Sequence, residues 1–459
     1  MDIDIQILWT DALVYVLVVT IIAFFFYTRS HPHLATPWRQ VFHRRLGMSA
    51  LLILLGFVSI GLLDSIHYRV GDNPETLSVF DKLAGPLRSQ VEKSFSAPFA
   101  TQLYARETIE LPDGKKIRGY PRLQYGGSHL NNPQQDRLAD IIDRSLSGLV
   151  TGTIAWSLLV LVVLILLARR HGIGVKALAG RVWRGDMKVP WKVIFATVGV
   201  IVLLFSMVVS LAGYYHILGT DKVGNDVLFL ALKSIRTGLV IGTLTTLVML
   251  PFAVLLGITA GYFRGWVDDL IQYIYTTLSS IPSILLIAAF ILMLQVYMSN
   301  HPDQFPTVIE RADARLLFLC LILGITSWTG LCRLLRGEAL KISQVDYIQA
   351  ATAFGVRHLR IITRHILPNV MHIVMISIVL DFSALVLAEA VLAYVGVGVD
   401  PTMNSWGNMI NSARLEMARE PIVWWSLMAA FMFMFTLVLA ANLFSDAVRD
   451  AFDPRLRKG

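Results

Sequence analysis

The sequence predicts an all-α polytopic membrane protein with about nine transmembrane helices. Of its 459 residues, 55% are hydrophobic and only 16% are charged, and the mean hydropathy is +0.61. A soluble domain typically has about 25% charged residues. Most of the apolar segments reach the ~20 residues that cross the hydrocarbon core of a bilayer. They lie at about 8–27, 46–63, 147–168, 191–213, 238–262, 270–297, 316–335, 369–397 and 422–444.

The basic residues of the short loops predict the orientation of the chain. Arginine and lysine gather in residues 28–45, 169–192 and 333–364 and in the C-terminal tail. All four regions fall on one side of the membrane, and cytoplasmic loops carry an excess of positive charge. We therefore expect the N-terminus outside and the C-terminus in the cytoplasm. The net charge of +8 then reflects topology rather than nucleic-acid binding.

The spans divide the chain into four predicted regions. These are transmembrane helices 1 and 2 in 1–63, an extracytoplasmic domain or structured loop with a small α/β insert in 64–146, the third span and a basic linker in 147–190, and a six-span core in 191–459. Asp113 and Gly114, between two β-forming stretches, predict a hairpin. Two possibilities stay open for 64–146, an independent domain and a loop packed on the membrane core.

Individual residues predict features of the spans. Gly257 and Gly261 have the spacing that lets two helices approach closely. Pro251 and Pro282 predict kinks, because proline lacks an amide hydrogen. The first span has no basic n-region before it and no small-residue cleavage site, so we expect an anchor rather than a cleaved signal peptide.

A polar, basic stretch at 343–368 interrupts the apolar C-terminal half. It predicts a short helix, a glycine turn and a second helix. Ser343, with Asp346 three residues later, predicts a capping box at the start of the first helix. Gly355 would supply its left-handed C-cap, and Pro368 would end the second helix.

This stretch resembles the coupling loop, or EAA motif, of bacterial ABC-import permeases. The family pattern is Glu-Ala-Ala, three residues, glycine, nine residues, isoleucine, one residue and Leu-Pro. Its spacing is held by Gln349, Ala350, Ala351, Gly355, Leu367 and Pro368. Gln349 replaces the glutamate and His365 replaces the isoleucine. The resemblance implies that loop 336–368 docks on an ATPase subunit through the first helix, which begins with Asp346 and Tyr347.

A DNA-binding helix-turn-helix has a similar rhythm of alanine, glycine and apolar residues. Spans lie directly on both sides of the stretch, so a regulator that binds DNA through this loop is disfavoured.

A second motif follows the fourth span. Gly219, Thr220, Asp221, Gly224 and Asp226 resemble a signature of the dipeptide/oligopeptide subfamily of these permeases. We expect this segment at the outer membrane surface, with its two aspartates capping the next helix. Two carboxylates are too few for a calcium site, and we expect no metal. The resemblance covers about 192–459 and is absent from 1–190.

The eighth span carries Asp381 and Glu389. A bare carboxylate at mid-bilayer costs roughly 2.5–3.5 kcal/mol on insertion scales, so each should face protein or water. Eight helical residues place the two about 12 Å apart along the axis, on nearly the same face. Two interpretations stay open: the pair lines a translocation path, or the two residues bond neighbouring helices or lie near an interface.

The sequence contains no phosphate-binding loop, no zinc motif and no nucleophile elbow, so we predict a non-enzymatic chain without its own cofactor. The resemblance implies a C-type permease subunit of an ABC importer for peptides or similar small solutes, in the bacterial inner membrane. The implied partners are a second permease, two ATPases that bind ATP and magnesium, an extracytoplasmic binding protein and the lipid bilayer, but no nucleic acid. The alternative is an ion-coupled secondary transporter that uses Asp381 and Glu389.

Overall fold

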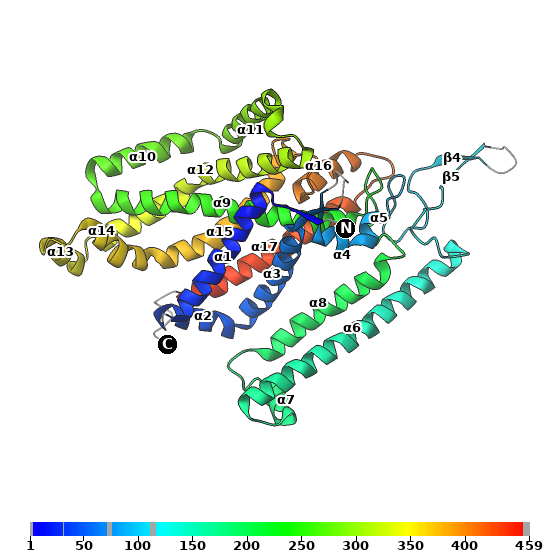
Figure 1. Cartoon of the computed structure of the whole chain (residues 1–459), viewed down its shortest axis with the longest axis horizontal. Helices are drawn as coiled ribbons and strands as arrows, with labels where there is room; N and C mark the ends of the chain where they lie inside the picture. Colours follow the sequence, from blue (N-terminus) through cyan, green and yellow to red (C-terminus); the bar gives the residue numbers. More distant parts are fainter. Residues whose placement is uncertain (1–2, 31, 71–75, 111–115, 453–459) are drawn as a thin grey trace. The chain divides into compact units, whose positions relative to one another are not determined.

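A computed structural model describes residues 3–30, 32–70, 76–110 and 116–452 (Figure 1). Within these ranges, nine helices are long and apolar enough to cross a membrane, as predicted. They are α1 (Trp9–Ser30), α3 (Arg45–Asp64), α6 (Pro133–His171), α8 (Trp191–Ala212), α9 (Val227–Phe263), α11 (Ser283–Asn300), α12 (Val308–Ile342), the continuous helix His358–Tyr394, and α17 (Trp425–Phe452). The prediction of an all-α polytopic membrane protein is confirmed.

The chain forms two compact units. The first comprises the residues up to Gln6, Phe42–Arg236 and Asn404–Ala440. The second comprises Ile7–Val41, Thr237–Met403 and the residues from Ala441 onwards.

In the first unit, the described residues between α3 and α6 (65–70, 76–110 and 116–132) form a small insert of short helices and strands. Its elements are β2 (His67–Val70), β3 (Leu77–Ser78), α4 (Val79–Leu83), α5 (Gly85–Ser89), β4 (Glu107–Glu110) and β5 (Lys116–Gly119). Strands β4 and β5 pair antiparallel, so the predicted hairpin is present, although its Asp113-Gly114 turn lies outside the described residues. The N-terminal strand β1 (Ile3–Gln6) pairs with β2, a contact that the sequence did not predict.

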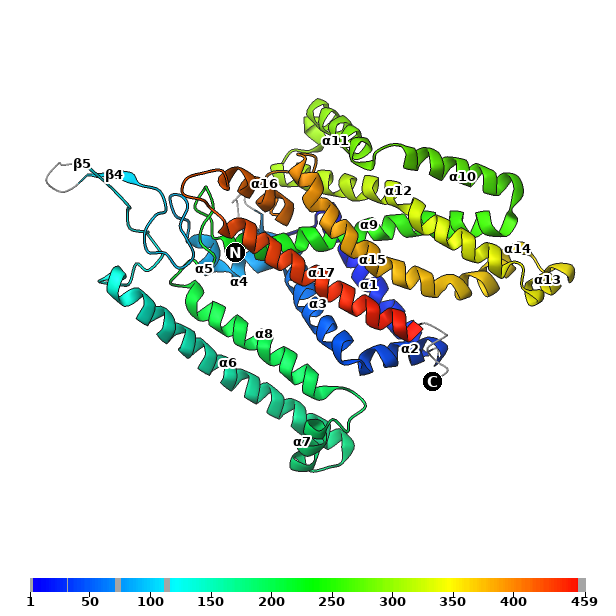
Figure 2. The same cartoon turned by 180° about the vertical axis from the view of Figure 1, so that it is seen from behind.

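The first unit also contains a close pair of spans, α6 and α8, which lie side by side in both views (Figures 1 and 2). A Cβ atom on Gly148 would lie 2.9 Å from Cα of Met207, and one on Gly152 would lie 2.9 Å from Cβ of Ser206. The Thr151 and Ser206 hydroxyls are 3.0 Å apart. Small residues and interhelical hydrogen bonds thus join the two helices, as is common inside membranes. The short helix α7 (Val175–Arg184) connects them.

The second unit contains α1, most of α2 (Pro32–His43) and most of α9. It also contains α10 (Gly265–Ser280), α11, the 3-10 helix η1 (Pro302–Gln304), α12 and the segments up to the end of α15 (Leu367–Tyr394). Helix α1 is attached to α12 through Asp313, whose carboxylate accepts hydrogen bonds from the backbone N–H (3.1 Å) and the hydroxyl of Thr10. Both residues are buried. The additional N-terminal span therefore packs on a helix of the predicted core.

The sixth predicted span, 270–297, is broken into α10 and α11. The break falls at Pro282, whose predecessor Ile281 is extended, as residues before proline usually are. The kink predicted at this proline is thus a complete interruption. Pro251 by contrast lies inside α9, which continues on both sides of it.

Helices α9 and α12 approach closely at the predicted glycine pair. A Cβ on Gly257 would lie 2.8 Å from the carbonyl oxygen of Cys332, and one on Gly261 would lie 2.8 Å from Cβ of Ala339. Because backbone and short side chains cannot move aside, we expect Gly261→Ala to destabilise the protein by about 1–3 kcal/mol.

Gly337 is the matched control for this prediction, because it lies within α12 and no atom comes within 4 Å of the position that a Cβ would take there. Gly337→Ala should be neutral or should stabilise by up to about 1 kcal/mol through helix propensity. Thermal unfolding of the two purified variants in detergent measures both effects. Equal shifts would contradict close packing at Gly261.

Candidate functional site

The loop with the EAA-like spacing connects α12 to α15 within the second unit. It consists of α13 (Asp346–Ala353), α14 (His358–Ile361) and a π-helical turn, η2 (Ile362–Ile366), which leads directly into α15. We call residues 336–368 the α12–α15 loop.

The predicted capping box at Ser343 is wrong. Ser343 ends α12, where its backbone N–H donates to the carbonyl of Ala339 and its hydroxyl donates to the carbonyl of Leu340. Helix α13 begins at Asp346 after Val345, and no side chain caps it. Ile342 is buried, so packing keeps the chain helical up to this residue, and Ser343 ends α12 instead of starting a new helix.

The predicted left-handed cap at Gly355 is confirmed. Its φ is +74°, and its N–H donates to the carbonyl of Thr352. The N–H of Val356 donates to the carbonyl of Ala351 at 3.1 Å. These two bonds form a Schellman motif, which closes the C-terminus of α13 and turns the chain toward α14.

Pro368 does not end the second helix, contrary to the prediction. It lies in the first turn of α15, where a missing N–H is tolerated. The turn before it is π-helical, and the N–H of Leu367 donates to the carbonyl of Ile362. The π turn shifts the hydrogen-bond register just before the proline. The chain therefore runs as one helix from His358 to Tyr394.

Buried isoleucines hold this loop against the ends of the surrounding helices. Ile348 is 1% exposed, and Ile361 and Ile366 are fully buried. They share one apolar cluster with Leu335 of α12 and Ile271 of α10. At roughly 1.5–3 kcal/mol for each fully buried isoleucine, this cluster holds the α12–α15 loop on the helices that it packs against.

The opposite surface of the loop exposes large apolar side chains. Phe354 is 85% exposed, Leu359 is 73% exposed and Tyr347 is 47% exposed. Tyr347 lies in α13 and Phe354 caps it, outside the bilayer-length helices, while Leu359 lies in the first turn of the helix His358–Tyr394. Single exposed apolar residues are ordinary, but three of them this close in the chain are of the kind that marks a protein contact. The predicted docking residues Asp346, Tyr347, Gln349, Ala350, Ala351 and Gly355 all lie on or beside α13.

Hydrogen bonds tie the loop to α9 and to the turn that follows it. The hydroxyl of Tyr262 lies 2.8 Å from Nδ1 of His358, and Arg264 donates to the hydroxyl of Ser343 at 2.9 Å. The side-chain amide of Gln349, at the position of the family glutamate, donates within the loop to the carbonyl of Gln344 at 3.1 Å.

At the base of the loop, Arg336 forms a two-pronged ion pair with Asp268, at 2.5 and 2.6 Å. The Arg336 guanidinium lowers the pKa of Asp268 below its ordinary value. Such a paired arginine and carboxylate fix the relative positions of the elements that carry them. This ion pair therefore ties the first turn of α10 to the base of the loop.

The two carboxylates of the eighth span lie on α15. Glu389 is 2% exposed, and Asp381 is half-buried. The structure does not bring either one to the α12–α15 loop, so a role in a translocation path stays a prediction.

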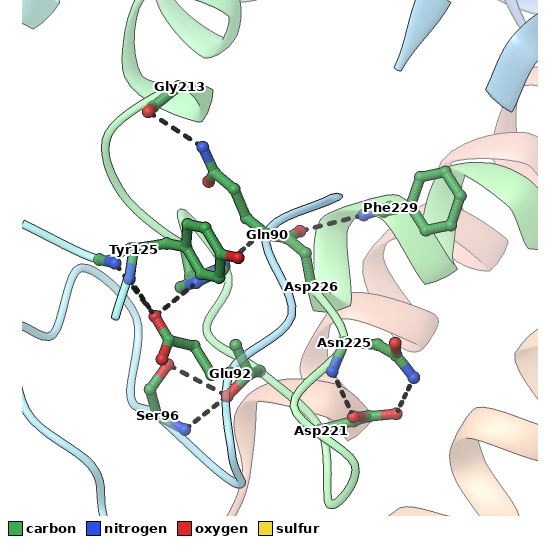
Figure 3. A network of polar contacts seen from close by, with 12 residues as sticks. Gln90, Glu92, Ser96, Tyr125, Gly213, Asp221, Asn225, Asp226 and Phe229 are labelled. Atoms are coloured by element: carbon green, nitrogen blue, oxygen red, sulfur yellow. Dashed lines mark hydrogen bonds and ion pairs between the residues drawn. The ribbon is translucent and has the colours of Figure 1, made fainter. Parts of the chain in front are cut away.

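The second predicted motif lies in the first unit, in the loop between α8 and α9 (residues 213–226). Asp226 caps α9, because its Oδ1 accepts the N–H of Phe229 at 3.1 Å (Figure 3). Asp221 instead closes a turn, since its Oδ1 accepts the N–H groups of Val223 and Asn225. The capping prediction is thus confirmed for Asp226 and wrong for Asp221. Among the described residues, no group of histidine, cysteine or acidic side chains could hold a metal ion.

The insert packs directly on this motif. The hydroxyl of Thr220 donates to the carbonyl of Ser94 at 2.8 Å and accepts the N–H of Ser96 at 2.7 Å. The carbonyl of Gly224 accepts the N–H of Glu92 at 2.9 Å. The indole N–H of Trp425 donates to the carbonyl of Thr220 at 2.9 Å. Three distant parts of the chain therefore meet at the motif.

A buried charged network, which sequence reasoning missed, completes this contact. His216 Nδ1 lies 2.8 Å from Asp226, and its Nε2 lies 3.5 Å from Glu92. Glu92 also accepts the N–H groups of Gln124, Tyr125 and Gly126 at 2.8–3.1 Å (Figure 3). No local pattern in the sequence links Glu92 to His216, so only the fold could identify the pair.

The pKa values of this network follow from its contacts. Burial alone would lower the pKa of His216, but the carboxylates of Asp226 and Glu92 raise it to about 9. Burial alone would raise the pKa of Glu92, but the neighbouring His216 and the three backbone N–H groups lower it to about 2. The ring of His216 and the carboxylate of Glu92 are therefore ionised at neutral pH.

The nine bilayer-length helices of the described residues define the class of integral-membrane proteins. The exposed apolar residues of the α12–α15 loop favour contact with another protein. Residues 253–458 match the family "Binding-protein-dependent transport system inner membrane component". The chain belongs to this family and is a multi-pass inner-membrane permease of binding-protein-dependent ABC importers.

Curated relatives support this assignment. The glutathione transport system permease protein GsiD of Pectobacterium atrosepticum is 32% identical over 53% of this chain and 73% of its own length. The dipeptide transport system permease protein DppC of Bacillus subtilis is 30% identical over 53% of this chain and 70% of its own. The oligopeptide transport system permease protein OppC of Mycobacterium tuberculosis is 31% identical over 55% and 80%. These relatives are permease proteins, which agrees with a non-enzymatic chain.

Proposed function

We propose that this permease forms a translocation path for peptides or similar small solutes, together with a second, related permease. The names of the relatives, which include dipeptide, oligopeptide and glutathione permeases, support this substrate class. An extracytoplasmic binding protein would deliver the substrate. The N-terminus would lie outside and the C-terminus in the cytoplasm, as the basic loops favour.

In this proposal, two cytoplasmic ATPase subunits, which bind ATP and magnesium, dock on the α12–α15 loops of the two permeases. One observation supports this step: Ile348 of α13 is buried in the apolar cluster, while the side chains of Tyr347 and Phe354 are exposed. A helix held in this way moves as a rigid body when its exposed surface is pushed. Because η2 continues into α15 without a break, such a movement would pass directly into the span that carries Asp381 and Glu389.

The proposal is tested by purifying the protein from its native membrane with whatever remains bound. Phe354→Asp alters only an exposed side chain, so the permease should fold normally and lose its ATPase subunit. Gly355→Arg should have the same effect, because any residue with a Cβ atom is strained at a φ of +74°.

Gly172→Arg is the matched control, because Gly172 also has a positive φ, +64°, and open space around it, but lies at the end of α6. The Gly172→Arg variant should still co-purify with the ATPase subunit. If wild type carries no ATPase, or if Phe354→Asp retains it, docking through α13 is wrong. The ion-coupled alternative would then be tested through Asp381 and Glu389.

A further inference from the structure

Seven cationic side chains surround α7, and we call them the α7 basic surface. They are Arg169, Arg170, Lys176, Arg181, Arg184, Lys188 and Lys192. All seven are exposed, and the only acidic residue between them is Asp186. In the part of the chain that the structure describes, none of the seven forms a salt bridge. Their charge is therefore available to an external anion.

The apolar side of α7 packs on α6 and α8 and so fixes the position of the α7 basic surface along these two spans. Leu178 is fully buried and Val182 is 7% exposed, and both pack in one cluster with Ala168 and Phe195. Ala168 lies in the last turn of α6, and Phe195 lies in the first turns of α8. Helix α7 therefore lies across the ends of two membrane spans (Figures 1 and 2). With α6 and α8 as membrane spans, we expect its charges at the level where hydrocarbon gives way to lipid headgroups.

Two tryptophans, Trp183 and Trp191, lie beside the α7 basic surface, as is expected near the boundary between headgroups and acyl chains. Trp183 is 75% exposed, and the Lys192 ammonium lies 4.9 Å from the centre of its ring. Trp191, at the start of α8, is half-buried. Indole rings gather at the boundary between headgroups and acyl chains, where one edge is wet and the other apolar.

We propose that the α7 basic surface binds the headgroups of anionic phospholipids. Their phosphates match the chemistry of the site, because guanidinium groups bind phosphate oxygens with two parallel hydrogen bonds. A lipid fits better than a soluble anion, since the adjoining surfaces of α6 and α8 expose apolar side chains, such as Leu166 and Ile201, that can contact its acyl chains. Because α7 is packed in place, the cations are presented without the cost of ordering a flexible loop.

The function of this site would be to anchor the α6–α8 pair at a defined depth in a membrane that contains anionic lipid. Anchoring of this kind needs only that α6 and α8 cross the bilayer, so it stands apart from the proposed substrate and from ATPase docking.

The test uses the full chain in nanodiscs of phosphatidylcholine alone or with phosphatidylglycerol added. Native mass spectrometry counts the lipids retained, and titration of phosphatidylglycerol into detergent gives its apparent affinity. The test variant combines Lys176→Gln, Arg181→Gln and Arg184→Gln. The control variant combines Lys82→Gln, Arg118→Gln and Lys222→Gln, which removes the same charge from exposed positions elsewhere in the first unit.

We expect wild type to prefer phosphatidylglycerol over phosphatidylcholine. Each cation lost should weaken this lipid about fivefold, so the test variant should bind it about a hundredfold more weakly, while the control variant is unchanged. Arg181→Lys with Arg184→Lys keeps the charge but loses the paired hydrogen bonds to phosphate, so its affinity should fall between those of wild type and the test variant. A single Lys176→Gln change gives the same test, at about fivefold, if the triple variant folds poorly.

Three results would overturn the proposal. One is no preference for phosphatidylglycerol. Another is an equal loss in the test and control variants, which would indicate attraction to net charge alone. The third is displacement of the lipid by inorganic phosphate or by an acidic peptide at comparable concentration, which would identify a soluble anion or a protein as the ligand.

Discussion

Replacing Gly224 with alanine is expected to detach the insert from the α8–α9 loop and to lower the stability of the protein strongly. Its φ of +89° already costs an L-residue about 1–2 kcal/mol. A Cβ there would also overlap the carbonyl group of Glu92, which is backbone and cannot rotate away. The displaced segment would lose the hydrogen bond from Glu92 to Gly224, leaving buried groups unpaired at about 1–3 kcal/mol each. The total loss should reach about 3 kcal/mol or more.

Gly172→Ala separates the conformational cost of a positive φ from the cost of the steric overlap and the lost hydrogen bond. Gly172 has a φ of +64° and no atom within 4 Å of its Cβ position, so only the conformational cost applies there. Thermal unfolding in detergent gives the stabilities, and limited proteolysis of the insert reports its release. We expect rapid cleavage of the insert only in Gly224→Ala. If both variants lose the same stability and resist cleavage equally, the insert does not depend on this contact.

Much of the membrane part could be predicted from the sequence, because the bilayer requires about 20 apolar residues for each crossing and backbone bonds closed within each helix. The close approach at Gly257 and Gly261 was predictable for a similar reason, since it depends on the small residues themselves. A kink at Pro282 was predictable too, but not the complete break, because Pro251 lies inside the uninterrupted α9. The Schellman motif at Gly355 also follows from local chemistry.

The features that sequence reasoning missed depend on distant packing. Ser343 has a good capping side chain, but α12 continues through the buried Ile342, so Ser343 ends this helix instead of starting the next one. Pro368 can start a helix as well as end one, and the π turn before it decides between them. The short strand β1 has no pattern that indicates β2 as its partner.

The network of Glu92, His216 and Asp226 could not be predicted from the sequence either. Its members come from the insert and from the α8–α9 loop, and only the folded chain brings them together. Asp226 could be recognised as a helix cap, because a cap depends on the next few residues. Its second role, as the partner of a buried histidine, could not.

This network leads to a prediction for the dependence of stability on pH. The pKa of His216 is about 9 in the folded protein, against an ordinary value of 6.5. Its contribution is therefore complete below pH 6.5 and is lost as the pH rises through 9. The pKa of Glu92 is about 2, against 4.5, so its contribution is complete above pH 4.5 and is lost only as the pH falls toward 2. Both contributions are complete between pH 4.5 and 6.5.

The alkaline limb is the easier one to measure. One pKa unit corresponds to about 1.4 kcal/mol, so wild type should lose on the order of 3 kcal/mol between about pH 6.5 and 10 through His216. His216→Gln should be less stable than wild type at about pH 6, because two buried carboxylates lose their cation, and its stability should change little over the same pH range. His171→Gln, at an exposed position, should follow wild type throughout. Thermal unfolding from about pH 6 to 10 checks all three proteins. An equally steep decline in His216→Gln would mean that another group controls the alkaline limb, and the insert would then be held by its neutral hydrogen bonds alone.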